Sequence, residues 1–499
     1  MEAIFGSILW KDLGLILPEL ILLAIFILLI IIDLIFKNNK LNATVSIIGS
    51  FIVLLSLLTQ KDLNNALFMG IYIIDAFGVF FKYLVILSTL IVFLMSIISE
   101  ELHNSKIWLG EYYILIFGMA IGMFFISGSV NLILIYLSLE TMSMSSYVLA
   151  GYTKQIKRAS EASLKYVIFG SLSSGIMIFG ISLLYGLTGS LDLNTINLYI
   201  ATDGANNLLL FVSFLFILVG FGYKISAVPF HFWTPDVYEG SPITITAYLS
   251  VASKAAGFAV FVRFLYMALV DNTAYFSGVY SIIKNVKWDY VIAVLSVLTM
   301  TLGNVVALWQ NNVKRMLAYS SIAHAGYILM AVTVMSNLGI SSILIYLFFY
   351  LFMNFGAFLI VMIFAHKIGS EDMDKYVGLG YRSPLMATLL TIILVSLIGL
   401  PPTGGFIGKL YIFWAVLDKG MIWLAVIGIL NSVISLYYYA KVIRNMWLRD
   451  VDSQNEKLQY SIYTNILAIV LTLPILLFFV YFSPILKWAE YSANIFLGK

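Results

Sequence analysis

The amino-acid sequence predicts an all-α integral membrane protein with about 14 transmembrane helices, and three observations support this fold class. First, 62% of the 499 residues are hydrophobic and only 11% are charged, whereas a soluble domain is typically about 45–50% apolar and about 25% charged. Second, the mean hydropathy is +1.00. Third, apolar windows close to the ~20 residues that a helix needs to cross a bilayer recur along the whole chain. They fall near residues 13–36, 43–60, 75–99, 111–128, 130–151, 160–186, 207–231, 243–266, 288–308, 314–335, 340–366, 383–417, 421–446 and 460–483.

The composition also restricts the chemistry of the chain. It contains no cysteine, so thiolate-ligated iron–sulfur clusters and disulfides are excluded. Four histidines leave little scope for haem or a multi-histidine metal site. The net charge of +3 is too small to indicate a nucleic-acid partner. We therefore expect no redox chemistry, no cofactor and no metal in this chain itself.

The distribution of lysine and arginine predicts the orientation in the membrane. Short cytoplasmic loops carry an excess of these residues. Fourteen of them follow odd-numbered spans, and seven lie at the termini or after even-numbered spans. The odd-numbered exits are therefore predicted to face the cytoplasm or its equivalent. Because the number of spans is even, both termini are predicted to lie outside.

A small group of charged residues lies inside the apolar windows. A charge at the bilayer centre costs at least a few kcal/mol, so such residues normally face a bundle interior or a wet cavity and mark an ion path. The alternative is an inert buried ion pair, for example Glu140 with Lys224. Four cations with one obvious anion cannot all be neutralised in pairs, which favours the ion path. The group consists of Glu140, Lys165, Lys224, Lys254 and Lys409.

Lysine suits proton transfer for a physical reason. Desolvation and a nearby cation both lower the pKa of a buried lysine from about 10.4, to about 5–6 in extreme cases, and a carboxylate partner raises it again. Moving the partner would therefore load or unload the amine. Arginine stays protonated and could not do this. A series of buried lysines with one glutamate predicts a proton relay.

The spans contain other titratable residues, for which the sequence leaves both a relay role and a structural role open. His231 and His324 titrate near pH 7 and are candidates for the relay, although a lone intramembrane histidine is more often a structural hydrogen-bonding residue. Lys82, Arg263 and Lys441 lie near helix ends, where long cationic side chains can reach the interface. We interpret these three as interfacial anchors.

Two spans carry helix-breaking residues next to a buried lysine. In VGFGYKISAVPFHFWTPD, Pro229 follows Lys224 by five residues. In SLIGLPPTGGFIGKLYIFW, Pro401 and Pro402 shortly precede Lys409. Proline removes a backbone donor, and freed backbone groups at membrane depth are tolerated only inside protein or beside water. Discontinuous helices at matching positions of two halves indicate a transport site.

The positions of the breaks predict an internal repeat. They fall in spans seven and twelve, so a unit of five helices would cover spans four to eight and nine to thirteen, and an odd unit gives inverted repeats. The predicted division is 1–110 for N-terminal helices one to three, 111–270 for the first inverted repeat, 288–446 for the second, and 447–499 for the last helix.

Several long motifs resemble a known family. LSLETMSMSSYVLAGY, KISAVPFHFWTPDVYEGSPITITAYLSVASKAAGF, NNVKRMLAYSSIAHAGYILM and LVSLIGLPPTGGFIGKLYIF are similar to the antiporter-like subunits of proton-pumping NADH:quinone oxidoreductase, respiratory complex I. The similarity extends over most of residues 100–420. TPDVYEG with the following SVASKAAGF resembles subunit N in particular, rather than subunits L or M.

This resemblance implies roles for individual residues. Glu140 would be the switch partner of Lys224, Lys254 the central lysine, and Lys409 the terminal lysine on the exit side. Lys165 would be an additional lysine of span six. The proton would pass Lys254 with the help of His231 and water, and His324 is a further candidate.

The resemblance also implies partners and a location. NADH, FMN, iron–sulfur clusters and quinone would belong to partner subunits, and this chain would adjoin the antiporter-like subunit M and the small subunits K and J. The expected membrane is the bacterial plasma membrane, with the mitochondrial inner membrane as an alternative. Two other functions stay open from the residues: a subunit of a multisubunit Na⁺/H⁺ antiporter, and a purely structural membrane subunit.

Overall fold

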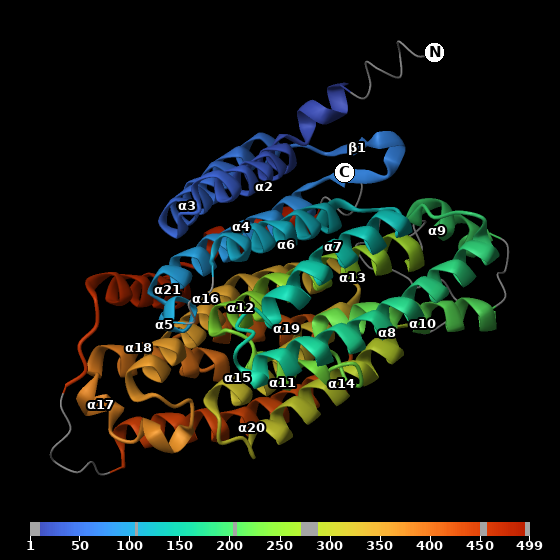
Figure 1. The fold of residues 1–499 in the computed structure, drawn as a ribbon. Helices are drawn as coiled ribbons and strands as arrows, with labels where there is room; N and C mark the ends of the chain where they lie inside the picture. The colour runs from blue at the N-terminus through green and yellow to red at the C-terminus, as the bar shows by residue number, and fades with distance from the viewer. Residues whose placement is uncertain (1–9, 105–107, 203–206, 271–287, 450–456, 495–499) are drawn as a thin grey trace.

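The computed structural model describes residues 10–104, 108–202, 207–270, 288–449 and 457–494. The chain is almost entirely helical (Figure 1). Its elements are, in order, α2 (Leu17–Phe36), α3 (Asn39–Ser56), η1 (Leu57–Gln60), β1 (Asn65–Leu67), η2 (Phe68–Gly70), β2 (Tyr72–Ile74), α4 (Ala76–Ile98), α5 (Glu100–Asn104), α6 (Gly110–Gly128), α7 (Leu132–Ala150), α8 (Lys157–Thr188), α9 (Leu193–Thr202), α10 (Asn207–Ile225), α11 (Trp233–Gly240), α12 (Ile243–Tyr248), η3 (Leu249–Ser253), α13 (Lys254–Phe264), η4 (Leu265–Leu269), α14 (Trp288–Ala307), α15 (Val313–Val334), α16 (Asn337–Ile368), η6 (Met373–Tyr376), α17 (Leu379–Arg382), α18 (Pro384–Ile398), α19 (Gly404–Asp418), α20 (Ile422–Trp447), α21 (Ile462–Val480) and α22 (Ser483–Asn494).

The predicted fold class is confirmed. In the part of the chain that the structure describes, thirteen helices are long and apolar enough to cross a membrane. The shorter apolar helix α18 and its neighbour α19 together fill the remaining predicted window, 383–417. The two termini, whose side of the membrane was predicted, lie outside the described residues.

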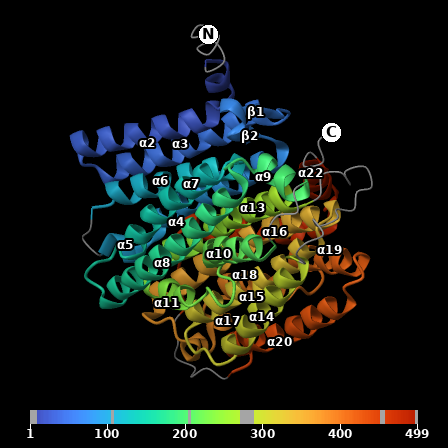
Figure 2. The same cartoon turned by 90° about the vertical axis from the view of Figure 1, so that its right-hand side faces the viewer.

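The helices pack side by side in one bundle, with a layer at one edge formed by α2 and α3 (Figures 1 and 2). These two helices pack on each other and on α4 and α6. Between α3 and α4 the chain forms a short antiparallel hairpin, in which Asn65 pairs with Ile74. The α2–α3 layer covers one side of the bundle that holds the charged residues.

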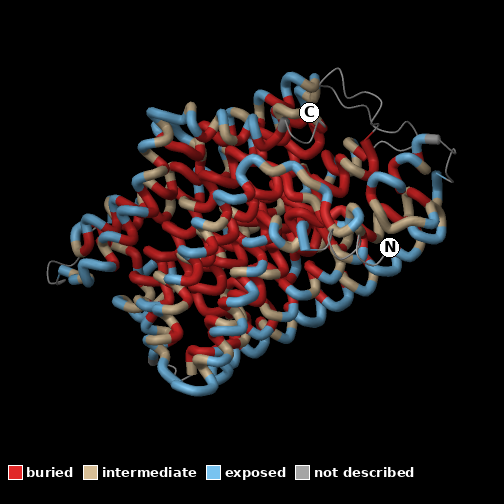
Figure 3. The backbone as a smooth tube through the Cα atoms, turned by 90° about the horizontal axis from the view of Figure 1, so that it is seen from above, coloured by how far each residue is buried: buried red, intermediate tan, exposed pale blue. Residues whose placement is uncertain are grey.

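The centre of the bundle is formed by the spans that carry Lys254 and His324. The span Ile243–Leu269 is buried along its whole length, and α15 and α16 are each 94% buried in their most apolar window. By contrast, most residues of α8 and α20 are not buried. Figure 3 shows that buried residues gather in the interior of the bundle and exposed ones at its rim. Lys254 therefore lies on a span that is shielded by its neighbours, and the residue is 2% exposed.

Both predicted helix breaks are present. After α10 the chain leaves the helical conformation at Ser226, which has a φ of +62°, and resumes as the short helix α11. Between α18 and α19, Gly399 has a φ of +86°, a region that favours glycine. These breaks agree with two five-helix units, whose exact division stays a prediction.

A third interruption was not predicted. The helix that follows α11 changes to a π-helical turn at Leu249–Ser253, directly before Lys254. Such turns insert one extra residue per turn and occur frequently at functional sites. The sequence of this segment contains no proline or glycine that would signal the change.

Two residues interpreted as interfacial anchors instead form buried ion pairs. Lys82 pairs with Glu19, and both side chains are 1% exposed. The Arg263 guanidinium binds Asp75 through two hydrogen bonds of 2.8 Å and also donates to the carbonyl of Ser127. The anchor interpretation is therefore wrong for Lys82 and Arg263, because acidic residues from distant segments neutralise them inside the bundle.

Replacing Asp75 by alanine should lower the free energy of unfolding by about 3–5 kcal/mol, because the Arg263 guanidinium would stay buried without its carboxylate. The measurement is the melting temperature of the chain purified in detergent, followed by size-exclusion chromatography after heating. Lys441→Ala is the control, since Lys441 is partly exposed and, among the described residues, donates a long, exposed hydrogen bond of 3.4 Å to Asn311. Equal melting temperatures for the two variants would contradict the structural role of the Asp75–Arg263 pair.

Candidate proton-transfer site

Glu140 and Lys224 face one small cavity. The cavity has a volume of about 20 Å³, enough for a single water molecule. Glu140 Oε1 accepts a hydrogen bond from Ser174 Oγ at 2.5 Å, and Lys224 Nζ donates to Ser143 Oγ at 2.8 Å. The fold therefore brings the two side chains together, as the sequence predicts. In the described structure each of them is hydrogen-bonded to a serine, and no direct ion pair joins them.

The end of α10 supplies the environment of Lys224. This residue is the last but one of the helix, where the free carbonyls and the helix dipole favour a cation. The freed carbonyl of Tyr223 is satisfied by the indole Nε1 of Trp233, at 3.0 Å. Lys224 Nζ also lies 5.9 Å from the centre of the Tyr166 ring. The break thus positions the amine beside polar backbone and an aromatic face.

Lys254 occupies the centre of the bundle. Its Nζ donates to the carbonyl of Ser321 at 2.9 Å and to Ser321 Oγ at 2.5 Å. Ser321 Oγ in turn shares a hydrogen bond of 2.8 Å with the hydroxyl of Tyr350. The ring of Tyr238 lies 5.8 Å from the amine. Every polar group that contacts Lys254 here is neutral.

His324 lies between Lys254 and Lys409. It follows Ser321 by three residues on α15 and therefore shares its face. Its Nδ1 bonds the hydroxyl of Tyr346 at 2.5 Å, and its Nε2 bonds that of Tyr439 at 3.2 Å. The imidazole also lies beside the rings of Tyr350 and Tyr327, with ring centres 5.5 Å and 6.0 Å away. The histidine is thus the titratable group that the fold places between the central and terminal lysines.

Lys409 makes its contacts at the second helix break. Its Nζ donates to the carbonyl of Ile398, the last residue of α18, at 2.7 Å, and to Ser432 Oγ at 3.0 Å. The amine lies 4.6 Å from the centre of the Tyr327 ring, three residues beyond His324 on α15. As at Lys224, a helix C-terminus supplies negative potential to a buried lysine.

Two other predicted residues lie apart from this series. Lys165 was expected in the middle of a span, but it lies near the start of α8 and its side chain is 36% exposed, in ion pairs with Asp236 at 2.6 Å and Glu161 at 2.8 Å. His231 lies in the break after α10 and its ring packs against Phe232. In the described ranges no hydrogen bond joins His231 to a buried lysine.

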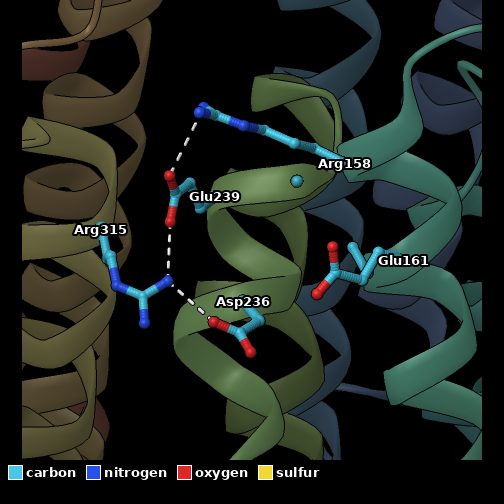
Figure 4. Close-up of a pocket in the computed structure, with 7 residues that line it drawn as sticks. Arg158, Glu161, Asp236, Glu239 and Arg315 are labelled. Atoms are coloured by element: carbon cyan, nitrogen blue, oxygen red, sulfur yellow. Dashed lines mark hydrogen bonds and ion pairs between the residues drawn. The ribbon is translucent and has the colours of Figure 1, made fainter.

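The charged residues around Lys165 line a pocket that sequence reasoning missed. It has a volume of about 160 Å³ and lies among α8, α11 and α15 (Figure 4). Arg315 Nη1 binds Asp236 at 2.8 Å and Glu239 at 2.7 Å, and Glu239 also pairs with Arg158 at 3.6 Å. Burial would raise the pKa of the Asp236 carboxyl, but hydrogen bonds from Lys165 and Arg315 outweigh it and hold that pKa below its usual range.

The sequence contains partial signals for the acidic residues that sequence reasoning did not identify. Glu19 lies inside the first apolar window, as Glu140 does inside the fifth, and the same cost of burial applies to it. Asp236 and Glu239 stand in TPDVYEG, just after the first break. Asp236 pairs with Lys165, 71 residues earlier, and with Arg315, 79 residues later. Only the fold reveals pairs that are so far apart in the sequence.

Comparison with known proteins identifies a family and several relatives that cover the residues described above. The profile of the family "NADH:quinone oxidoreductase/Mrp antiporter, TM" matches residues 129–435. NADH-quinone oxidoreductase subunit N of Chlorobium chlorochromatii is 46% identical over 97% of this chain and 95% of its own length. NAD(P)H-quinone oxidoreductase subunit 2 of Trichodesmium erythraeum is 39% identical over 88% of this chain and 82% of its own.

Solved structures share the fold. A chain of respiratory complex I from Thermus thermophilus superposes with a TM-score of 0.78 at 26% identity, covering 94% of this chain and 99% of that one. A chain of the Mrp complex from Dietzia has a TM-score of 0.82 at 19% identity, covering 96% of both chains, and shows the likeness of fold alone.

The fold and the buried lysines define an antiporter-like, multi-pass membrane subunit. The family match and the relatives are consistent with that class over almost the whole length of the chain. The chain belongs to the NADH:quinone oxidoreductase/Mrp antiporter transmembrane family, and its curated relatives at 39–47% identity include several subunits N of NADH-quinone oxidoreductase.

Gly405→Ala should destabilise the chain by about 1–3 kcal/mol, the usual cost of overpacking. A Cβ at Gly405 would lie 1.9 Å from the carbonyl oxygen of Ser396, so α19, which carries Lys409, would have to move away from α18. Gly186→Ala in α8 is the control, since a Cβ there meets nothing within 4 Å. Melting temperatures in detergent distinguish the two. A Gly405→Ala variant as stable as Gly186→Ala would contradict the close contact at the break.

Proposed function

We propose that this chain is an antiporter-like membrane-arm subunit of a proton-translocating NADH:quinone oxidoreductase. It would conduct protons through a relay of glutamate, lysine and histidine, in which the lysines and His324 are buried and Glu140 is partly buried. The observation that carries the proposal is the spacing of three buried amines through the bundle, each bound only to neutral oxygens in the described structure. We refer to Lys224, Lys254 and Lys409 as the lysine row.

The proposed route begins at Glu140 and Lys224. Glu140 shares a cavity with Lys224 and can change the affinity of that amine for a proton by moving toward or away from it. The helices of Lys224 and Lys254 touch, since a Cβ at Gly257 would lie 3.5 Å from the Cβ of Lys224. In the proposed route, a proton leaving Lys224 would cross this helix contact to reach Lys254.

The second half of the proposed route follows α15. Ser321, His324 and Tyr327 recur every three residues on this helix, and they contact Lys254, the tyrosine hydroxyls and Lys409 respectively. Hydroxyl and imidazole groups both donate and accept protons, which a transfer chain requires. The structure supports His324 more strongly than His231 as the histidine of the relay, because His324 lies between two lysines.

In this proposal, the redox chemistry is carried out by partner subunits. NADH, FMN, iron–sulfur clusters and quinone would be bound by other subunits, and quinone reduction there would drive the changes around Glu140. Subunits M, K and J are the proposed neighbours, in a bacterial plasma membrane with the basic loops on the cytoplasmic side. In this proposal Lys165 belongs to the charged pocket on that side, where it would contribute to proton uptake.

A subunit of a multisubunit Na⁺/H⁺ antiporter is the alternative function. A chain of the Mrp complex has the same fold, but only 19% of its residues are identical. Identity of 46% over 97% of this chain supports the oxidoreductase instead. The lysine row would serve either function, because both move protons across the membrane.

Lys224→Met should lower the number of protons moved per NADH oxidised by at least about tenfold, since a positioned proton carrier typically contributes about 10²–10⁴-fold. Glu140→Gln should lower it in the same direction, because the switch charge is lost. The measurement is proton uptake by membrane vesicles that contain the assembled complex. Lys441→Met is the matched control on an exposed helix face. Normal pumping by an assembled Lys224→Met complex would refute the relay.

His324→Asn should also reduce pumping, because asparagine preserves hydrogen bonding to Tyr346 or Tyr439 but does not bind a proton near neutral pH. The same vesicle assay measures it. His366→Asn is the control, since His366 lies in the last turn of α16, away from the lysine row. If both variants pump equally well, His324 has only a structural role.

A further inference from the structure

An aromatic pair separates the charged pocket from Lys224. Tyr166 of α8 and Trp233 of α11 stack with their ring centres 4.5 Å apart and their planes 17° from parallel. We propose that this stacked pair is the barrier in a proton-uptake route from the charged pocket to Lys224, and that Asp236 is the positioning residue that holds the barrier closed. The inference rests on the proposed proton relay and names the uptake side of it.

The two helices that carry the rings also form the walls of the pocket. Ala162 lines the pocket, and Tyr166 lies one turn further along α8. Asp236 lines it too, and Trp233 lies three residues earlier, at the start of α11. Each ring therefore lies about one turn beyond a pocket residue on its own helix. The pocket itself has room for several water molecules, which makes it a source of protons.

On its other side, the aromatic pair borders the environment of Lys224. Lys224 Nζ lies 5.9 Å from the centre of the Tyr166 ring. Ser146 Oγ donates to the Tyr166 hydroxyl at 3.4 Å, and Ser143, one turn earlier on α7, accepts from Lys224. Both Tyr166 and Trp233 are at most 1% exposed. A continuous water chain from the pocket to the lysine requires these rings to separate.

Trp233 is held in place by contacts at both ends of α11. The indole donates to the carbonyl of Tyr223 at 3.0 Å, and Asp236 in the first turn of α11 binds Lys165 of α8 and Arg315 of α15. Glu239 in the last turn of α11 also binds Arg315, at 2.7 Å. A helix of only eight residues is not stable alone in water, so packing and these contacts decide where it lies. Asp236 joins both neighbouring helices with charge-assisted hydrogen bonds, which are the strong kind.

The proposed step transfers one proton from water to Lys224. When α11 moves and the rings separate, a water molecule of the newly formed chain gives a proton to the neutral amine of Lys224. The pocket waters replace that proton from the aqueous phase. When the ion pairs of Asp236 form again, the rings close behind the ammonium group and the charge cannot return. This is the directionality that a pump needs at its uptake side.

A thiol reporter tests this inference, and the chain is suited to it because it contains no cysteine. Ser146→Cys places a thiol just behind the aromatic pair, where Ser146 is 0% exposed. The complex is purified in detergent with this reporter, treated with a small water-soluble methanethiosulfonate cation, and the modified peptide of this chain is quantified by mass spectrometry over time. NADH oxidation of each preparation reports whether the complex has assembled.

With Asp236→Asn added to the reporter, modification should be roughly tenfold faster, because access rises with the population of the open arrangement. Asp236→Glu should restore the slow rate, and Trp233→Ala should also give fast modification. Glu161→Gln is the matched control: it removes one negative charge from the same pocket, but Glu161 pairs with Lys165 of its own helix and does not bind α11.

Fast modification in the parent reporter, or equal rates for Asp236→Asn and Glu161→Gln, would overturn the inference. The experiment measures access and not pumping, so its failure is distinguishable from failure of the proposed relay. Normal pumping by Lys224→Met would refute the relay while leaving the access measurement intact. Slow modification of Trp233→Ala in an assembled complex would show that the aromatic pair is not the barrier.

Discussion

The cost of placing an ammonium group in an apolar bundle determines much of this structure. An isolated charge cannot stay in a low-dielectric interior, so each buried lysine needs oxygen atoms close by. Helices that cross a membrane bond their backbone carbonyls internally, and a helix end or break leaves some of them free for other partners. Lys409 takes the carbonyl that ends α18, and Lys224 lies in the last turn of α10. The second break thus supplies an oxygen directly to Lys409, and the first places Lys224 at a helix C-terminus.

The same cost distinguishes two kinds of buried cation. Lys82 and Arg263 contact carboxylates, whose negative charge fixes the positive one in place. The lysine row contacts serine hydroxyls and carbonyls, and within the described residues no carboxylate lies within 4 Å of its amines. A neutral oxygen tolerates both the charged and the uncharged amine, so a proton can leave without creating a buried anion. The first kind of contact fixes a charge within the fold, and the second is the kind that the proposed proton relay requires.

The sequence predicts the spans, both breaks and the three lysines of the row, because each depends on local features: a run of apolar residues, a proline or glycine, a charge inside the run. It misplaces Lys165, since the apolar window that contains this lysine gives no sign of Asp236, 71 residues further on. It misinterprets Lys82 and Arg263 for the same reason, because Glu19 and Asp75 lie on other helices. The π-helical turn before Lys254 lies at the buried centre of the bundle, and no proline or glycine in Leu249–Ser253 signals it in the sequence.

The arrangement of α15 explains how two such halves can act together. This helix begins at the charged pocket, where Arg315 binds Asp236 and Glu239 of α11, and it continues past Ser321, His324 and Tyr327 to the contacts of Lys254 and Lys409. A displacement of α11 therefore changes the forces on the helix that carries the partners of the other two lysines. The buried helix α15 thus connects the charged pocket to the contacts of Lys254 and Lys409. In the proposed relay, this one helix would couple proton uptake at Lys224 to release at Lys409, with no need for the two ends of the lysine row to touch.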